Sequence, residues 1–257
     1  MKNENKVAVI TGSASGIGLA MAESFLKEGY KVCFSDLNKQ ALDEVLKAHS
    51  DSQCLGILCD VSKENEVRNL IHKSAEHFGR IDVLINNAGL QYVANIEDFP
   101  VSKFEQMLQI MLVGAFISTK YVLPFMKKQN FGRIINMASI NGLIGFAGKA
   151  AYNSAKHGLI GLTKVTALEC ASFGITANAI CPGYVDTPLV RGQMQDLAKT
   201  RGVSLEQVLD EVLYPLIPQK KLIDINDIAS LALFLSSLSA KHITGQNLVI
   251  DGGYTAQ

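Results

Sequence analysis

The chain has no tryptophan, no surplus of either charge and no long uninterrupted apolar segment. Lys+Arg and Asp+Glu both number 24, so the protein lacks the basic field that attracts nucleic acid or an anionic membrane surface. The apolar run near the N-terminus is too short for a signal peptide, and no later 18-residue apolar segment indicates a membrane span. We therefore expect a soluble, cytoplasmic protein whose partner is a small molecule.

Cysteines with metal-binding or redox spacing are also missing. The five cysteines lie scattered in apolar surroundings, without a CxxC pair or a zinc-type arrangement. This pattern predicts reduced core residues and no metal site. The cysteines are Cys33, Cys54, Cys59, Cys170 and Cys181.

What the chain does have is a regular alternation of apolar β-branched runs and amphipathic stretches. Its 257 residues, 48% of them hydrophobic, suit one large domain better than two small ones. The runs are apolar throughout, as in parallel strands that are covered on both faces. The alternation predicts an α/β fold, a doubly wound (Rossmann-like) parallel sheet of about seven strands with helices on both faces. The runs are KVAVITG, KVCFSD, CLGILCD, DVLINNAG, GRIINMAS, GITANAICPG and NLVIDGG.

The amphipathic stretches predict the helices, and one long interval has no strand. That interval, 187–222, is rich in Gln, Asp, Lys and Arg, which gives it a helical and surface-like character, and it follows a late strand. It predicts a mobile helical lid over the carboxyl edge of the sheet, where such folds bind ligands. The predicted helices span roughly 16–29, 37–49, 63–78, 101–128, 152–173 and 224–238.

Two of these helices carry more apolar surface than one sheet face covers. The stretches 101–128 and 152–173 have apolar side chains on more than one face, which indicates burial against a symmetry mate. The sequence does not distinguish a dimer from a tetramer. The residues concerned are Phe116, Ile117, Val122, Leu123, Leu159, Leu162 and Val165.

A glycine-rich loop, TGSASGIG, follows the first predicted strand and opens the first helix. In that context Gly12 allows a tight turn, Gly16 lets the backbone approach a pyrophosphate, and Gly18 permits close packing of helix on strand. Asp36, at the end of the second strand, suits the ribose diol of an adenosine, and its charge repels a 2′-phosphate. The cofactor predicted is therefore NAD rather than NADP, although Asp36 also fits an N-cap of the helix 37–49.

Two further strand ends meet the same edge of the sheet. Asp60 is placed to accept a hydrogen bond from an adenine amino group. Asn86 and Asn87 either satisfy backbone groups around the cofactor or serve as ordinary turn residues before a glycine.

Five motifs together resemble the short-chain dehydrogenase/reductase family along essentially the whole chain. They are TGSASGIG, NNAG, Ser139, YNSAK and CPG, in this order and at these separations. The resemblance implies NAD binding, and it implies a homotetramer because the family is commonly tetrameric. It adds to the expected cofactor site Thr11, Ser15, Ile17, Val61, Asn87, Ala88, Gly89, Tyr152, Lys156, Pro182, Gly183, Val185 and Thr187.

Tyr152 and Lys156 lie one helical turn apart, so their side chains share a face. Hydride transfer at a carbinol carbon requires a proton to leave or join the oxygen, and a phenol is a poor base at neutral pH unless its pKa is shifted. We expect Lys156, together with the oxidised nicotinamide, to lower the pKa of Tyr152. Ser139 holds the substrate oxygen by a hydrogen bond. The resemblance assigns these three residues the same catalytic roles.

One position departs from the family pattern. Met111 stands where the family usually has an asparagine that positions a water between the lysine and solvent. We expect impaired but real turnover, with the backbone carbonyl of residue 111 holding the water. The alternative is that a neighbouring polar group replaces the asparagine.

Within this family the chain is most similar to (R)-3-hydroxybutyrate dehydrogenases. That resemblance rests on LQYVANIEDFP, GKAAYNSAKHGLIGLTKV, AICPGYVDTPLV and DGGYTAQ. It implies a hydroxy- or oxo-acid substrate whose carboxylate is bound by Gln91, Asn141, Lys149 and Gln193, beside Ser139 and Tyr152. Asn141 replaces a usual histidine and Tyr254 a usual tryptophan. For Lys149, an ordinary solvated surface lysine is the alternative.

Two other functions remain open from the sequence. One is another enzyme of the family that acts on a sugar, a polyol or an acyl thioester. The other is a catalytically weak nucleotide-sensing protein, which Met111 alone supports.

Overall fold

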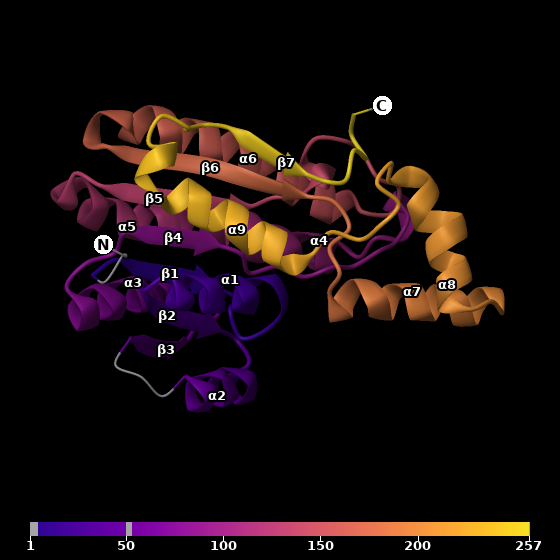
Figure 1. Cartoon of the computed structure of the whole chain (residues 1–257), viewed down its shortest axis with the longest axis horizontal. Coiled ribbons are helices and arrows are strands. Elements are labelled where there is room, and N and C mark those ends of the chain that lie inside the picture. Colours follow the sequence, from indigo (N-terminus) through magenta and orange to yellow (C-terminus); the bar gives the residue numbers. More distant parts are fainter. Residues whose placement is uncertain (1–4, 50–52, 257) are drawn as a thin grey trace.

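The computed structural model describes residues 5–49 and 53–256; within 189–201 the side chains at 189, 193, 196, 197 and 199–201 fall outside this description. The described residues form a seven-stranded parallel sheet in the order β3-β2-β1-β4-β5-β6-β7 (Figure 1). Because the order reverses direction between β1 and β4, ligands are expected at the carboxyl ends of these strands. The strands are β1 Val7–Thr11, β2 Lys31–Asp36, β3 Cys54–Leu58, β4 Val83–Asn86, β5 Gly132–Met137, β6 Ile175–Pro182 and β7 Asn247–Ile250.

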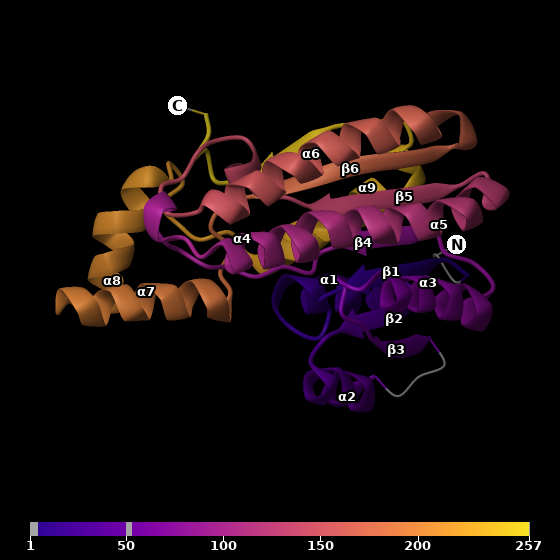
Figure 2. The same ribbon diagram turned by 180° about the vertical axis from the view of Figure 1, so that it is seen from behind.

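Helices cover both faces of the sheet, as predicted (Figures 1 and 2). On one face α1, α2 and α9 bury apolar side chains, and on the other α3, α5 and α6 do so. The helices are α1 Gly16–Lys27, α2 Lys39–Ala48, α3 Glu64–Phe78, α4 Val101–Leu108, α5 Gly114–Gln129, α6 Ala150–Cys170, α7 Pro188–Arg201, α8 Leu205–Val208 and α9 Ile225–Ser236.

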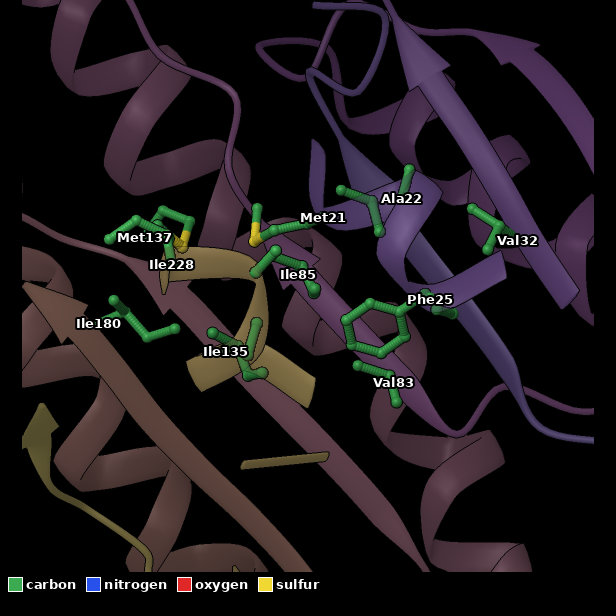
Figure 3. Packing of buried hydrophobic residues seen from close by; sticks show 14 of the residues in the cluster. Met21, Ala22, Phe25, Val32, Val83, Ile85, Ile135, Met137, Ile180 and Ile228 are labelled. Carbon is green, nitrogen blue, oxygen red and sulfur yellow. The ribbon is translucent and has the colours of Figure 1, made fainter. Parts of the chain in front are cut away.

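The alternation of side chains along each strand explains the continuous apolar runs. In β1, Ala8 and Ile10 belong to the core on one face, whereas Val9 belongs to the core on the other. Figure 3 shows the first of these cores, in which Phe25 and Met21 of α1 pack over strand residues such as Ile85. All seven predicted strands and all six predicted helices are therefore present.

The long helix predicted over 101–128 differs from the prediction in one respect. It is interrupted by a π-helical turn, Gln109–Val113, which separates α4 from α5. Taken as one unit, Val101–Gln129 is long and apolar enough to meet a composition test for a membrane span, at a mean hydropathy of 1.4. Within the described residues, its segments α4 and α5 contact α3, α6 and the sheet, and 39% of the apolar window is buried inside the protein.

The apolar faces of α5 and α6 only partly match the expected exposed surface. Ile117, Val122 and Leu159 are buried inside the subunit, so these three do not contribute to a surface that could face a symmetry mate. Phe116 and Val165 remain about half exposed, at 51% and 52%, and they are joined by Leu168 at 83%.

The predicted lid segment is helical and stands apart from the layers that cover the sheet. It contains α7, α8, a π turn at Leu209–Leu213 and a 3-10 turn at Tyr214–Leu216 (Figures 1 and 2). Backbone hydrogen bonds join the residues that flank the segment on either side. Asp186 N–H donates to the Ile223 carbonyl at 2.9 Å, and Ile223 N–H donates to the Tyr184 carbonyl at 2.9 Å. The mobility of the segment stays a prediction.

All five cysteines are free thiols, as predicted. Four are buried, and Cys54 is partly exposed.

Candidate active site

One cavity of about 630 Å³ opens at the carboxyl ends of the strands and gathers nearly all of the predicted site residues. It is lined by Gly12, Ser15, Gly16, Ile17, Gly18, Asp36, Asp60, Val61, Asn87, Ala88, Gly89, Gln91, Ser139, Asn141, Lys149, Tyr152, Lys156, Pro182, Gly183, Val185 and Thr187. Thr11 does not line the cavity; it is buried and contacts the lining residues Asn87 and Ala88. Gln193 lies in α7, and its side chain is outside the described residues.

The glycine loop has the geometry that its sequence predicted. Gly12 and Gly16 have φ values of +63° and +54°, in the left-handed region that favours glycine. A Cβ on Gly18 would lie 2.1 Å from the Gly12 carbonyl oxygen, so helix and strand approach too closely for a side chain there. A Cβ on Gly16 would meet no atom within 4 Å, and this open space lies at the N-terminus of α1. The loop therefore offers a cradle for a phosphate group.

Asn87 and Thr11 hold this loop in place. The Asn87 amide donates to the carbonyls of Thr11 at 3.0 Å and Gly12 at 2.9 Å, and the Thr11 hydroxyl accepts from the backbone N–H of Asn87 and Ala88. Asn86 instead donates to Asn136 at 2.8 Å, below the site. The first of the two roles expected for the asparagine pair, satisfying backbone groups, is thus confirmed for Asn87.

Asp36 organises the neighbouring turn with both of its carboxylate oxygens. One accepts from the Ala14 N–H at 3.1 Å and the other from the Asn38 N–H at 3.0 Å. The alternative role of Asp36 as an N-cap is wrong, because Asn38 caps α2 by accepting from the Ala41 N–H. Asp60 lines the same end of the cavity, and its carboxylate accepts from the Ser62 hydroxyl at 2.6 Å.

Ser139, Tyr152 and Lys156 meet at the other end of the cavity. The Lys156 ammonium donates to the Met137 carbonyl at 2.6 Å and lies 5.3 Å from the centre of the Tyr152 ring. Ser139 ends the segment after β5, and its hydroxyl accepts from the Asn141 N–H at 3.1 Å. A phenol, a hydroxyl and an ammonium therefore face one space, as the spacing in the sequence predicts.

Burial acts strongly on both titrating groups of this cluster. Burial raises the pKa of Tyr152, and the hydrogen bond with Ser139 offsets this only in part. Burial also lowers the pKa of Lys156 to about 8. In the protein alone the pKa of Tyr152 is therefore raised. The lowering expected from Lys156 together with the oxidised nicotinamide concerns the cofactor complex and stays a prediction.

Lys149 lies at the rim of the cavity near Tyr152. Among the described residues no carboxylate pairs with its ammonium, and the cavity wall there holds no other cation besides Lys156. Its backbone forms a parallel bridge with Ala94, in the loop that also carries Gln91. The Gln91 side-chain oxygen is buried with no hydrogen-bond partner, and Asn141 is buried close by. Lys149 is thus not a fully solvated surface lysine.

Comparison with known proteins places this geometry in a family. A family model described as enoyl-(acyl carrier protein) reductase matches residues 12–255. The chain is 54% identical to an uncharacterized oxidoreductase, YxjF, of Bacillus subtilis, covering 98% of this chain and 99% of that one. It is 45% identical to a D-beta-hydroxybutyrate dehydrogenase of Rhizobium meliloti over the same shares. Levodione reductase has a similar structure, with a TM-score of 0.91, 33% identity and 98% coverage of both chains.

The chain belongs to the short-chain dehydrogenase/reductase family. As an oxidoreductase of this family with a Rossmann-like fold, it uses a nicotinamide nucleotide cofactor. The left-handed glycine turn, the open space at Gly16 and the acceptor Asp36 fit such a dinucleotide. Among the described residues no cluster of three His, Cys, Asp or Glu side chains offers a metal site.

Met111, the departure from the short-chain dehydrogenase pattern, lies inside the π turn and is buried. Its thioether packs toward Gly89, where a Cβ would lie 3.4 Å from the sulfur, and it shares an apolar cluster with Met107 and Ala155. A π turn shifts the backbone hydrogen bonds of a helix and often occurs at functional sites. The structure therefore fills the asparagine position with apolar packing and alters the backbone beside it.

Several residues of the cavity wall were not predicted from the sequence. Most are apolar residues next to predicted ones at strand ends, and their position in the chain was the only available signal. Tyr184 did offer a signal in the sequence, because an aromatic residue directly after CPG at a strand end is a recognisable candidate. The full set is Leu37, Cys59, Leu90, Gln106, Ile110, Met137, Ala138, Ile140, Tyr184 and Val190.

Proposed function

We propose that this protein is an NAD-dependent dehydrogenase that interconverts (R)-3-hydroxybutyrate and acetoacetate. The observation that carries the proposal is Lys149, a cation without a carboxylate partner among the described residues, at the rim of the cavity that contains Ser139 and Tyr152. An unpaired positive charge on the wall of the same cavity as the reacting groups suits a small acid with one carboxylate. The relative named D-beta-hydroxybutyrate dehydrogenase supports the same substrate class.

NAD is proposed over NADP because of Asp36. Its carboxylate lines the cavity at the end of β2, where it accepts from backbone N–H groups and keeps lone pairs free for two ribose hydroxyls. A 2′-phosphate would meet this negative charge. The neighbour Leu37 supplies no cation to compensate.

Ser139, Tyr152 and Lys156 are proposed to transfer the proton of the substrate hydroxyl. A nicotinamide cofactor, when bound, would supply the hydride chemistry at the carbinol carbon of the substrate. Ser139 donates a hydrogen bond to the substrate oxygen, and the Tyr152 oxygen accepts the hydroxyl proton in oxidation and gives it back in reduction. Lys156, fixed by the Met137 carbonyl, places positive charge beside the phenolate and binds ribose hydroxyls.

The substrate acid is held by its carboxylate at the rim. Lys149 pairs with it, while Gln91 and Asn141 donate amide hydrogen bonds, and Gln193 of the lid is the fourth proposed partner. The buried Gln91 side-chain oxygen has no partner in the protein, but as an acceptor it cannot bind a carboxylate, so the proposed donor is the NH₂ group of this amide.

A substrate panel tests the proposal directly. Purified protein is mixed with NAD and with hydroxy acids, polyols and hydroxyacyl thioesters, and NADH absorbance is followed. We expect the highest kcat/KM for (R)-3-hydroxybutyrate and little signal with its mirror image. Turnover of a thioester, sugar or polyol alone would establish another activity within the family, and binding of NAD without any turnover would indicate a nucleotide-sensing protein.

Lys149 provides the sharpest single test. Removing one partner of a desolvated charge pair costs about 2–4 kcal/mol, so Lys149→Ala should lower kcat/KM for the acid by that amount. An uncharged 3-hydroxy ester never uses the ammonium and should lose much less. Equal losses for acid and ester would contradict the assignment.

We also propose a homotetramer in the cytoplasm. The support is three large apolar side chains that the subunit leaves exposed on two neighbouring helices, Phe116 on α5 and Val165 and Leu168 on α6.

A further inference from the structure

The ammonium of Lys149 is held by aromatic rings rather than by a counterion. Its Nζ lies 4.4 Å from the centre of the Phe146 ring and 5.9 Å from the centre of the Tyr184 ring. Both distances are within the range of about 6 Å in which a cation is attracted to the face of an aromatic ring. The two rings come from different loops, one after β5 and one after β6.

The backbone around Phe146 fixes this arrangement. Lys149 N–H donates to the Phe146 carbonyl at 3.3 Å, and Ala94 N–H donates to the Gly148 carbonyl at 3.0 Å. Gly148 has a φ of +78°, in the left-handed region, and a Cβ there would lie 3.0 Å from Val93. The turn therefore presents the Phe146 ring and the Lys149 stem on the same side.

The second ring is fixed independently. Tyr184 lines the cavity, its carbonyl accepts from the Ile223 N–H at 2.9 Å, and its ring packs at 6.0 Å on that of Tyr254. Phe146 does not line the cavity and is 37% exposed. It is linked to the cavity wall by its contact with the Lys149 ammonium.

We infer that Phe146 is a positioning residue, whose ring holds the Lys149 ammonium at the cavity wall by a cation–π contact and leaves its charge free for a carboxylate substrate. The inference rests on the proposed function. An Asp or Glu partner would fix the flexible lysine stem too, but it would neutralise the charge and compete with the substrate. An aromatic face restrains the ammonium without either effect.

The Phe146 ring also affects the ionisation of Lys149. Burial of the lysine lowers its pKa, because desolvation works against the charged form. Contact with two aromatic faces favours the ammonium and opposes this trend. The contact with the Phe146 ring thus favours the charged form of Lys149 as well as its position at the cavity wall.

The experiment compares Phe146→Leu, Phe146→Tyr and Lys149→Ala with the parent protein, using (R)-3-hydroxybutyrate and its methyl ester. Phe146→Leu keeps an apolar side chain but removes the ring. We expect it to raise KM for the acid roughly threefold to tenfold, with kcat and the KM for the ester nearly unchanged. Phe146→Tyr keeps an aromatic ring and should retain the parent KM for the acid. Phe234→Leu, the same change at a 45% exposed position on α9, is the matched control and should alter none of these values.

The outcomes separate the inference from the proposed function. If Lys149→Ala raises KM for the acid alone while Phe146→Leu has no effect, the inference is overturned and the proposed function stands. If Phe146→Leu changes acid and ester equally, Phe146 only supports the loop, and the inference is overturned as well. If Lys149→Ala affects acid and ester equally, the carboxylate site itself is wrong and the inference fails with it.

Discussion

At the scale of single residues, the site depends on groups whose properties are set by burial. The Tyr152 phenol has a raised pKa, and the hydrogen bond with Ser139 is the contact within the protein that lowers it. Ser139→Ala removes that bond, so the pKa of Tyr152 rises further. Oxidation requires the ionised phenol, and the acidic limb of the profile of log kcat against pH should therefore move to higher pH.

This shift is measured by steady-state kinetics of oxidation in a series of buffers. A general loss of rate from weaker substrate binding lowers the whole curve without moving its limb. If Ser139→Ala lowers kcat while the limb stays where it is, Ser139 has no influence on the ionisation of Tyr152.

Asp36 acts at the same scale but on the cofactor. Asp36→Ala removes a charged acceptor for two ribose hydroxyls and the repulsion of a 2′-phosphate, so KM for NAD should rise about tenfold or more and the preference over NADP should narrow. Kinetics with both cofactors provide the measurement. Asp43→Ala, which removes an exposed partner of Lys39 in α2, is the control. If Asp36→Ala leaves the preference for NAD over NADP unchanged, Asp36 does not contact the ribose.

At the scale of secondary-structure elements, the π turn between α4 and α5 is the feature that no sequence pattern indicated. Met111 lies within it, buried among Met107, Ala151 and Ala155. Met111→Asn should raise kcat by up to about fivefold if a water relay is compromised, since one hydrogen bond contributes about 1 kcal/mol. It should also lower the melting temperature, because it places a polar amide in an apolar cluster.

The control for this prediction is Met107→Asn, one helical turn earlier in the same cluster. It should lose stability without any gain in kcat, as followed by thermal unfolding and steady-state rates. A neutral or lower kcat for Met111→Asn would mean that the site has been rebuilt around methionine.

These elements also show what the sequence does and does not predict. Strands and helices follow from apolar periodicity, and the glycine loop follows from its place between β1 and α1, because both signals are local. The π turn, the two backbone contacts of Asp36 and the aromatic contacts of Lys149 depend on groups brought together by the fold. The sequence predicted Lys149 but not its aromatic contacts: Phe146 lies three residues earlier in the chain, and Tyr184 comes from a strand end 35 residues later.

At the scale of the whole molecule, the exposed face of α5 and α6 leads to a prediction about assembly. Leu168 is 83% exposed, Val165 on the same helix and Phe116 on α5 are about half exposed, and burying such side chains between subunits would contribute the hydrophobic part of an interface. Leu168→Asp replaces one of them with a charge and should shift the mass measured by light scattering from a tetramer toward smaller species. Leu58→Asp, at a 49% exposed position on edge strand β3, should leave the mass unchanged. Because Ser139, Tyr152 and Lys156 all lie within one subunit, the smaller species should keep its affinity for NAD; if Leu168→Asp leaves the mass unchanged, subunits do not associate through this face.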